Sequence, residues 1–256
     1  MKKFICFILA CLILTICVGV AFEKSTVKVN SAGKQGWGFK KIEGRSPQFT
    51  KEQIETMEKY SCIYLGNDEK NVYLTFDEGY ENGYTKQILD TLRKHAVPAA
   101  FFITADYFEK NGDLVDIMVN DGHIVGNHTV NHPSLPTLSQ NDIKKEINGL
   151  SDRFLGKYGK NMKYLRPPMG EYSEKTLEIT QKMGYTNVFW SFAYKDWEIA
   201  KQAGKEHTLN QIKKYLHGGC VILLHAVSKD NADAMEEIIT YVRQMGYEFK
   251  TLDEYK

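Results

Sequence analysis

Two adjacent carboxylates, Asp77 and Glu78, follow an apolar run in the segment TFDEGYENGYT, residues 75–85. Neighbouring residues of a strand point to opposite faces. These two acids therefore do not form the facing pair of a glycosidase, whose carboxyl groups stand roughly 5 to 10 Å apart across the scissile bond. If both acids take part in chemistry, we expect them to have different tasks, such as metal ligand and general base.

Two histidines, His128 and His132, follow a later apolar run. Taken alone, their spacing is a weak indication of a metal site, because a loop histidine is more often solvated. Together with a carboxylate from another strand end, two histidines form an open zinc site that leaves a position for water or substrate. Other divalent metals accept the same ligands. We therefore expect a divalent metal ion, with Zn²⁺ as the first candidate.

Further polar residues also follow apolar runs. Arg166 stands before two prolines, and a rigidly held guanidinium suits a carboxylate partner. His225 directly follows CVILL, and Asp196 is a candidate to orient it, as carboxylates orient catalytic imidazoles. The structural alternatives stay open, because such an arginine is often a surface cation and such a histidine is often a hydrogen-bonded core residue. Trp197 is either a core residue or a pocket wall.

The elements that must position these residues alternate between strands and helices. Strands that are apolar on both faces, separated by amphipathic helices, indicate a parallel sheet covered by helices. The sequence predicts an incomplete β/α barrel of seven parallel strands, with a doubly wound open sheet as the alternative. The predicted strands are residues 71–76, 99–103, 123–127, 164–166, 187–190, 220–224 and 247–252. The predicted helices are residues 84–96, 114–122, 138–158, 173–184, 209–219 and 231–246.

Functional residues of parallel β/α folds gather at the carboxyl ends of the strands. The acids, the histidines and the tryptophan described above follow predicted strands, and Arg166 is the last residue of one. We therefore expect their loops to open on one mouth of the barrel.

The amino-terminal segment differs from the rest of the chain. Three residues, Met1-Lys2-Lys3, precede residues 4–22, which carry no charge. This pattern predicts a signal peptide or a membrane anchor over residues 1–22, so we expect the remainder to be exported and to meet a membrane only through this segment. Residues 23–61, including GWGFKK, predict a strap or linker with a short helix within 46–60. Residues 62–256 form the expected main domain.

The composition limits the possible partners. The 33 basic and 32 acidic residues nearly cancel, which argues against nucleic acid as a main partner. We expect a monomer. Outside the amino-terminal segment the chain has only Cys62 and Cys220, which do not make a disulfide framework. Whether they pair stays open, although small buried free cysteines are common.

Five motifs, TFDEG, HTVNH, RPPMG, KDW and ILLH, resemble in this order those of the polysaccharide deacetylases, carbohydrate esterase family 4. The resemblance covers about residues 62–256. GNHTVNHPSL and LLHAVSKDNA are similar to the delta-lactam-biosynthetic de-N-acetylases of spore-forming bacteria. The resemblance implies a distorted seven-stranded β/α barrel and a metal-dependent N-deacetylase that acts on the glycan strand of peptidoglycan. Its implied substrate is N-acetylmuramic acid stripped of its peptide, and its product leads to the muramic δ-lactam of spore cortex.

The resemblance also implies catalytic roles. Asp77 is the implied general base, held by Arg166. His225 is the implied general acid, oriented by Asp196.

The implied binding residues fall into two groups. His128 and His132 bind the metal, and Glu78 takes the position of a third ligand. The implied substrate-binding residues are Trp197, Met169 and Pro168.

Two residues depart from the family pattern. Glu78 stands where the family usually has aspartate, which leaves open whether it reaches the metal. Ala193 stands where the fourth motif usually begins with aspartate or asparagine. The alternatives are a deacetylase of N-acetylglucosamine or chitin, and a catalytically weak glycan-binding protein that lost its metal through Glu78.

Overall fold

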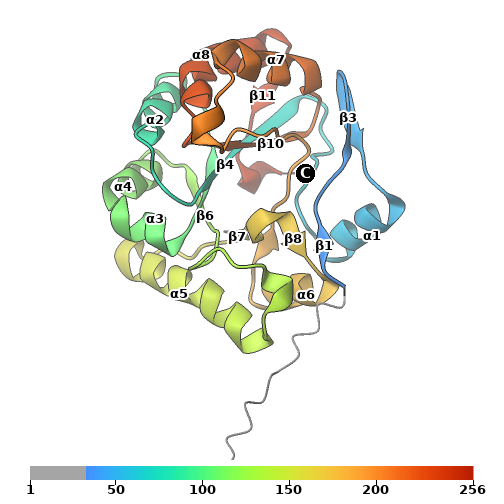
Figure 1. Ribbon diagram of the computed structural model, residues 1–256, viewed down its shortest axis with the longest axis vertical. Coiled ribbons are helices and arrows are strands. Elements are labelled where there is room, and N and C mark those ends of the chain that lie inside the picture. The colour runs from blue at the N-terminus through green and yellow to red at the C-terminus, as the bar shows by residue number, and fades with distance from the viewer. Residues whose placement is uncertain (1–32, 256) are drawn as a thin grey trace, which may run out of the picture.

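The computed structural model describes residues 33–255 (Figure 1). A parallel sheet forms its centre, in the order β10-β4-β5-β6-β7-β9, and β11 also pairs with β4. These strands are β4 (Asn71–Glu78), β5 (Ala100–Ile103), β6 (Ile124–Asn127), β7 (Tyr164–Leu165), β9 (Thr186–Asn187), β10 (Cys220–His225) and β11 (Glu248–Phe249).

The sheet curls into a distorted barrel. Beyond β9, Phe192 pairs in parallel with Ile222 of β10, and Ile63 pairs in parallel with Val188. The pairing of Phe192 with Ile222 connects the two ends of the sheet, so the predicted barrel of seven parallel strands is confirmed. The segments expected at 187–190 and 247–252 contribute only the two-residue strands β9 and β11.

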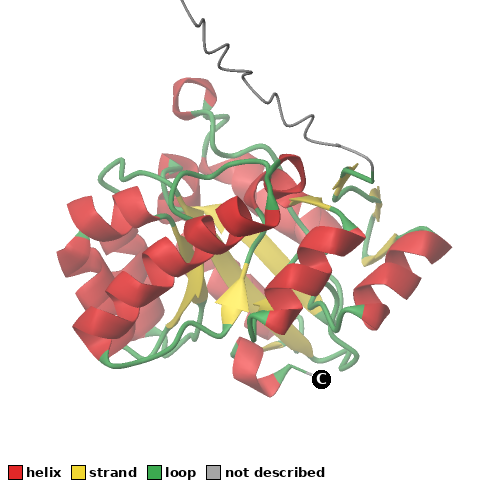
Figure 2. Cartoon of the chain, turned by 90° about the horizontal axis from the view of Figure 1, so that it is seen from below, coloured by secondary structure: helices red, strands yellow, loops and turns green. Residues whose placement is uncertain are grey.

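Helices surround the curled sheet (Figures 1 and 2). They are α1 (Lys51–Lys59), α2 (Thr85–Lys94), α3 (Ala105–Lys110), α4 (Gly112–Asn120), α5 (Gln140–Tyr158), α6 (Glu174–Lys182), α7 (Lys205–Tyr215) and α8 (Lys229–Gln244). Short 3-10 helices add η1 (Leu135–Thr137), η2 (Pro168–Gly170), η3 (Ile199–Lys201) and η4 (Leu252–Glu254).

Several helices differ from the sequence prediction. The helix expected within 46–60 begins only at Lys51, because β3 (Arg45–Gln48) pairs with β2 (Lys40–Ile42) before it. The helix α7 begins at Lys205 rather than at residue 209, since its polar first turn gives no apolar signal. The helix α3 was not predicted, because its six residues are too few for a periodic pattern.

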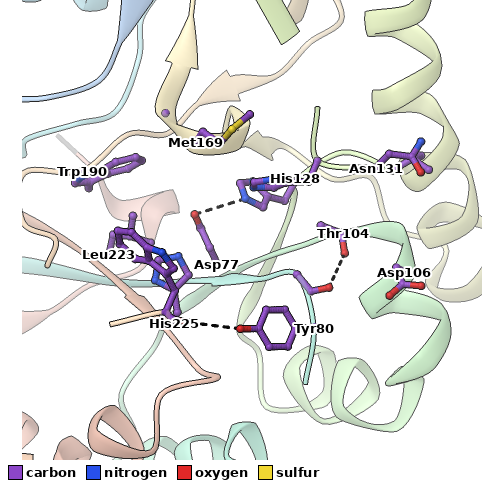
Figure 3. A pocket seen from close by; sticks show the side chains of 15 residues that line it. Asp77, Tyr80, Thr104, Asp106, His128, Asn131, Met169, Trp190, Leu223 and His225 are labelled. Carbon is purple, nitrogen blue, oxygen red and sulfur yellow. Dashed lines mark hydrogen bonds and ion pairs between the residues drawn. The ribbon is translucent and has the colours of Figure 1, made fainter. Parts of the chain in front are cut away.

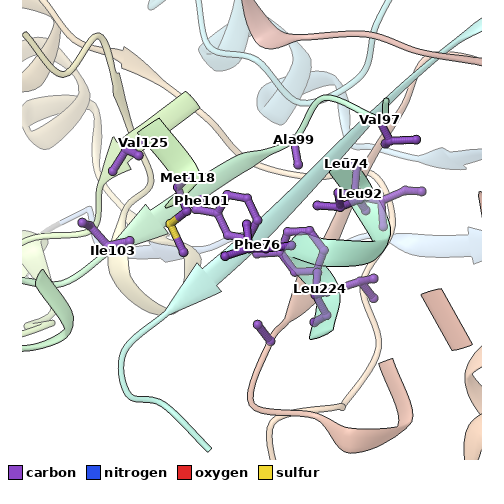
Figure 4. Close-up of a cluster of buried hydrophobic side chains, with 14 of the residues drawn as sticks. Leu74, Phe76, Leu92, Val97, Ala99, Phe101, Ile103, Met118, Val125 and Leu224 are labelled. Carbon is purple, nitrogen blue, oxygen red and sulfur yellow. The ribbon is translucent and has the colours of Figure 1, made fainter. Parts of the chain in front are cut away.

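The central strand β4 carries two different faces. Leu74 and Phe76 pack outward against the helical layer, where Phe76 stacks on Phe101 at 4.9 Å between ring centroids (Figure 4). Tyr73 packs with the inner cluster of the barrel. The alternation therefore sends Thr75 and Asp77 towards the barrel interior and Glu78 towards the helices.

The predicted strap packs firmly on the barrel. Its strand β1 (Gln35–Gly36) pairs antiparallel with β8 (Glu171–Tyr172), and the buried ring of Trp37 lies 4.9 Å from that of Phe189. Trp37 Nε1 donates a hydrogen bond to the carbonyl oxygen of Trp190 at 2.8 Å. The approach requires Gly170, which has a φ of +65° and whose Cβ would stand 2.7 Å from the ring of Trp190. The strap is thus part of the folded body.

The signal or anchor predicted at residues 1–22, and the first part of the strap, lie outside the described residues. Within residues 33–255, none of the helices combines the length and apolar character needed to cross a membrane.

The two remaining cysteines, Cys62 and Cys220, are both free and buried. Burial raises the pKa of each thiol to about 12. Both thiols are therefore protonated and serve as small core residues.

The aromatic cluster under the strap should contribute much of the stability of the protein. Replacing Trp37, which is 7% exposed, with alanine should lower the free energy of unfolding by about 3 to 5 kcal/mol, because it leaves a large cavity. Chemical denaturation measures this change. The matched control is Trp197→Ala, since Trp197 is 46% exposed and its loss should hardly move the midpoint. Equal losses in the two variants would contradict the packing role of Trp37.

Candidate active site

A cavity of about 790 Å³ opens at the carboxyl ends of the strands (Figure 3). The structure brings six of the expected residues together in its wall, namely Asp77, His128, His132, Met169, Trp197 and His225. Arg166 and Asp196 lie buried behind this wall and make hydrogen bonds to it.

Arg166 is fully buried and its guanidinium is surrounded by acceptors. Nη1 donates to Asp77 Oδ1 at 2.7 Å, and Nη2 donates to Thr75 Oγ1 at 2.8 Å. Nε donates to the carbonyl oxygen of Val188 at 3.1 Å, and the guanidinium carbon stands 4.2 Å from the ring centroid of Phe102. Such a buried charge is tolerated only when its donors are satisfied.

The ion pair decides the charge of Asp77. Burial alone would raise the pKa of this carboxyl, but the charge and hydrogen bond of Arg166, together with the charges of His128 and His225, outweigh burial and hold the pKa below its ordinary value. Asp77 is therefore an ionised carboxylate in the cavity wall at neutral pH.

The environment of the two histidines favours their neutral imidazole form. His128 Nδ1 lies 2.8 Å from the carbonyl oxygen of Arg166, which can only accept, so Nδ1 carries the proton. His128 Nε2 keeps its lone pair and lies 3.6 Å from Asp77 Oδ2. The rings of His128 and His132 stand 4.7 Å apart. Burial lowers the pKa of His128 to about 4 and also lowers the pKa of His132.

The donor chemistry of this pair fits a metal ion. Neutral imidazole nitrogen is a common metal ligand, and a backbone carbonyl that fixes the opposite ring proton is its usual partner. Within the described chain, no group of three or more histidine, cysteine or acidic side chains is arranged as a metal site. The chain therefore offers His128 and His132 as ligands and leaves the other positions open.

The structure separates Glu78 from its neighbour. Asp77 lines the cavity, whereas Glu78 does not. Glu78 is completely buried, and neither carboxyl oxygen has a hydrogen-bond partner within residues 33–255. Burial raises the pKa of Glu78 well above its ordinary value, and the charges of Glu81 and Asp77 raise it further. A neutral carboxyl on the helix-facing side of β4 argues against the expected role of Glu78 as a third metal ligand.

His225 and Asp196 form the second charged pair of the site. Its Nδ1 lies 2.7 Å from Asp196 Oδ1, and its backbone N–H donates to Asp196 Oδ2 at 2.8 Å. Burial would lower the pKa of His225, but the charge and hydrogen bond of Asp196, together with the charge of Asp77, outweigh burial and raise it. The ring of Trp197 stands 5.3 Å from that of His225. The cavity thus holds one histidine that favours the charged form and two that favour the neutral form.

Backbone strain gathers around the cavity. Thr129, His132 and Met169 have φ values of 71°, 54° and 59°, in the left-handed region that costs non-glycine residues about 1 to 3 kcal/mol each. Met169 is 53% exposed and lines the cavity. Pro168, expected to contact substrate, is instead buried and absent from the lining, because the turn exposes Met169 and places the proline ring inside.

The cavity wall also contains residues that the sequence analysis did not identify. They include Tyr80, Thr104, Asp106, Asn131, Trp190 and Leu223. Most of them lie at or just after the end of a predicted strand, which was the available signal. The types of Tyr80, Trp190 and Leu223 gave no further indication, because aromatic and apolar residues at strand ends look like core residues.

Known proteins resemble this chain in sequence and fold. A model of the polysaccharide deacetylase family matches residues 65–188. The peptidoglycan-N-acetylmuramic acid deacetylase PdaA of Bacillus subtilis is 42% identical over 221 residues, covering 85% of this chain and 84% of that protein. A solved structure of PdaA, a family 4 carbohydrate esterase, superposes with a TM-score of 0.84 over 87% of this chain and 96% of its own. A peptidoglycan-N-acetylglucosamine deacetylase of Bacillus cereus is 32% identical, covering 77% of this chain and 72% of that protein.

The pKa of His225 should depend on Asp196. In metal-free protein, Asp196→Asn should lower this pKa, because the opposite charge that stabilises the imidazolium is removed. Histidine ring signals followed by NMR across pH measure the change. Asp106→Asn is the matched control, since Asp106 also lines the cavity but pairs with Lys110. A His225 pKa that does not move in Asp196→Asn would contradict the pairing.

Proposed function

This chain belongs to the polysaccharide deacetylase family, and we propose that it hydrolyses the acetamide of N-acetylmuramic acid in the glycan strand of peptidoglycan. The higher identity to the muramic acid enzyme than to the glucosamine enzyme supports this substrate. The observation that carries the proposal is one cavity holding an ionised Asp77 and a readily protonated His225, whose environments displace their pKa values in opposite directions. Such a divergence marks a base and an acid.

Asp77 is the proposed general base. Its ionised carboxylate accepts a proton from the water that attacks the amide carbonyl. The bond to Arg166 Nη1 occupies Oδ1, so Oδ2, on the side of His128, is the oxygen left for the proton.

His225 is the proposed general acid. The hydrogen bond from Nδ1 to Asp196 leaves Nε2 to donate its proton to the departing amine. An amine is a poor leaving group until it is protonated, so an acid separate from the base is required. Asp196 stabilises the imidazolium that carries this proton.

His128 and His132 are the proposed ligands of a divalent metal ion, with Zn²⁺ as the first candidate. A metal bound there would polarise the amide carbonyl and lower the pKa of a bound water. The two imidazoles are already neutral, as ligation requires. Met169 and Trp197 form the proposed walls for the sugar.

The product and the setting follow from the substrate. Deacetylation frees the amine of muramic acid beside its lactyl carboxyl, and condensation of the two with loss of water gives the muramic δ-lactam of spore cortex. Peptidoglycan lies outside the cytoplasm, so the proposed enzyme is exported through its amino-terminal segment.

Acetate release from glycan strands stripped of peptide tests this function. The wild-type protein should release acetate, and mass spectrometry should locate the lost acetyl group on muramic acid. Asp77→Asn should reduce the rate by about 10² to 10⁴, because it removes the base. Glu78→Gln is the matched neighbour and should keep nearly full activity, since glutamine imitates an uncharged buried carboxyl.

Acetate lost only from glucosamine residues would identify the alternative deacetylase, and no acetate with any divalent metal would reject the enzyme proposal. Equal losses in Asp77→Asn and Glu78→Gln would show that Glu78 takes part in the site.

Metal binding has its own test. His132→Asn should weaken Zn²⁺ binding by more than about tenfold, because it removes one of two protein ligands. Atomic spectroscopy after zinc loading and desalting measures the metal that stays bound, and circular dichroism confirms folding. Glu78→Gln should bind as much zinc as the wild type. A loss of zinc in Glu78→Gln alone would reverse the assignment.

A further inference from the structure

A buried hydrogen-bond network lies behind the Asp196–His225 pair, on the side away from the cavity. Asp196 is 3% exposed, and its Oδ1 is taken by His225 Nδ1. Its Oδ2 accepts from Asn231 Nδ2 at 2.6 Å as well as from the backbone N–H of His225. Asn231 belongs to the first turn of α8 and is completely buried.

Each polar atom of the Asn231 amide has a partner. One Nδ2 hydrogen goes to the Asp196 carboxylate, and Nδ2 also donates to the carbonyl oxygen of His225 at 3.0 Å. Oδ1 accepts from the hydroxyl of Tyr194 at 2.5 Å. The amide orientation is therefore fixed by chemistry, because the carboxylate and the carbonyl only accept.

The network continues in one direction. Tyr194 uses its proton on Asn231, so the hydroxyl of Thr208, 2.7 Å away, must donate to Tyr194. Thr208 is buried in α7. The donors thus run from Thr208 through Tyr194 and Asn231 to Asp196, and buried networks of this kind hold a single arrangement when every member is satisfied.

We infer that Asn231 is a positioning residue, which clamps the Asp196 carboxylate and the His225 backbone together so that Asp196 Oδ1 faces His225 Nδ1. The inference rests on the proposed function, in which His225 delivers the proton to the amine. Without the amide, Oδ2 keeps only the backbone N–H of His225, and the carboxylate is free to turn about its terminal bond. No other side chain within the described residues is seen to bond Asp196 Oδ2.

The other charged groups that act on His225 come from other elements around the cavity. They are Asp77 of β4 and Arg166 after β7, and His132 after β6 is influenced by His225 in turn. None of them contacts the Asn231 amide. A substitution at Asn231 therefore changes the support of Asp196 without touching the remaining cavity wall.

Three substitutions test the inference. Asn231→Ala should lower kcat for acetate release by about tenfold to a hundredfold with KM nearly unchanged, as for other residues that orient a catalytic group. Asn231→Asp keeps the shape but sets a carboxylate oxygen against Asp196, so at neutral pH its kcat should fall further. Tyr194→Phe removes one hydroxyl and should give a smaller loss in the same direction.

A spectroscopic reading separates positioning from stability. In zinc-free wild-type protein, the His225 Nδ1 proton should give a downfield NMR signal, assigned by its absence in His225→Gln. Asn231→Ala should broaden or remove this signal. The matched control is Ile238→Val, a buried residue of the same helix that should lower stability while keeping the signal and kcat.

The inference is overturned if Asn231→Ala keeps both kcat and the proton signal, or if Asn231→Asp is as active as the wild type. It is also overturned if Ile238→Val causes the same losses. Should Asn231→Ala fail to fold, Tyr194→Phe and Asn231→Asp decide. A wild-type protein that releases no acetate refutes the proposed function, and the proton signal still decides whether Asn231 holds the pair.

Discussion

A guanidinium in the centre of a barrel has lost the water that stabilises its charge, at a cost of several kcal/mol. Arg166 offsets that cost with bonds to Asp77, to Thr75 and to backbone carbonyls after β9. Those carbonyls lie where the sheet has only isolated pairings. The hydrogen bonds from the Arg166 guanidinium therefore also hold the irregular edge of the barrel. The fold and the site therefore depend on the same side chain.

Arg166 also sets the protonation of two groups in the cavity wall. Its side chain keeps Asp77 ionised, and its carbonyl oxygen sets the ring proton of His128. One residue along β4, Glu78 meets no such cation and is held uncharged by burial. Two neighbouring carboxyls thus take opposite charge states because strand alternation sends them into different environments. Asp196 favours the charged form of His225, on the neighbouring strand β10, as Arg166 favours that of Asp77.

Much of this arrangement could be predicted from the sequence, because it depends on local patterns. Apolar runs predicted the strands, and polar residues after them predicted which loops meet. The family motifs predicted the partnership of Arg166 with Asp77. The features that were predicted wrongly or not at all depend on tertiary contacts. Pro168 turns inward because its neighbour Met169 takes a left-handed conformation. The sequence has no pattern that predicts this conformation. Asn231 lies in an ordinary amphipathic helix and contacts Asp196 only through the fold.

The neutral state of the paired histidines has a consequence for the handling of protons. An ion that binds protonated imidazoles must displace their protons, so its apparent affinity falls as the medium becomes acidic. With a pKa of about 4, His128 has no proton to lose over the ordinary range of pH, and burial moves His132 in the same direction. A metal ion bound by this pair, as proposed, would therefore have little proton to displace from His128.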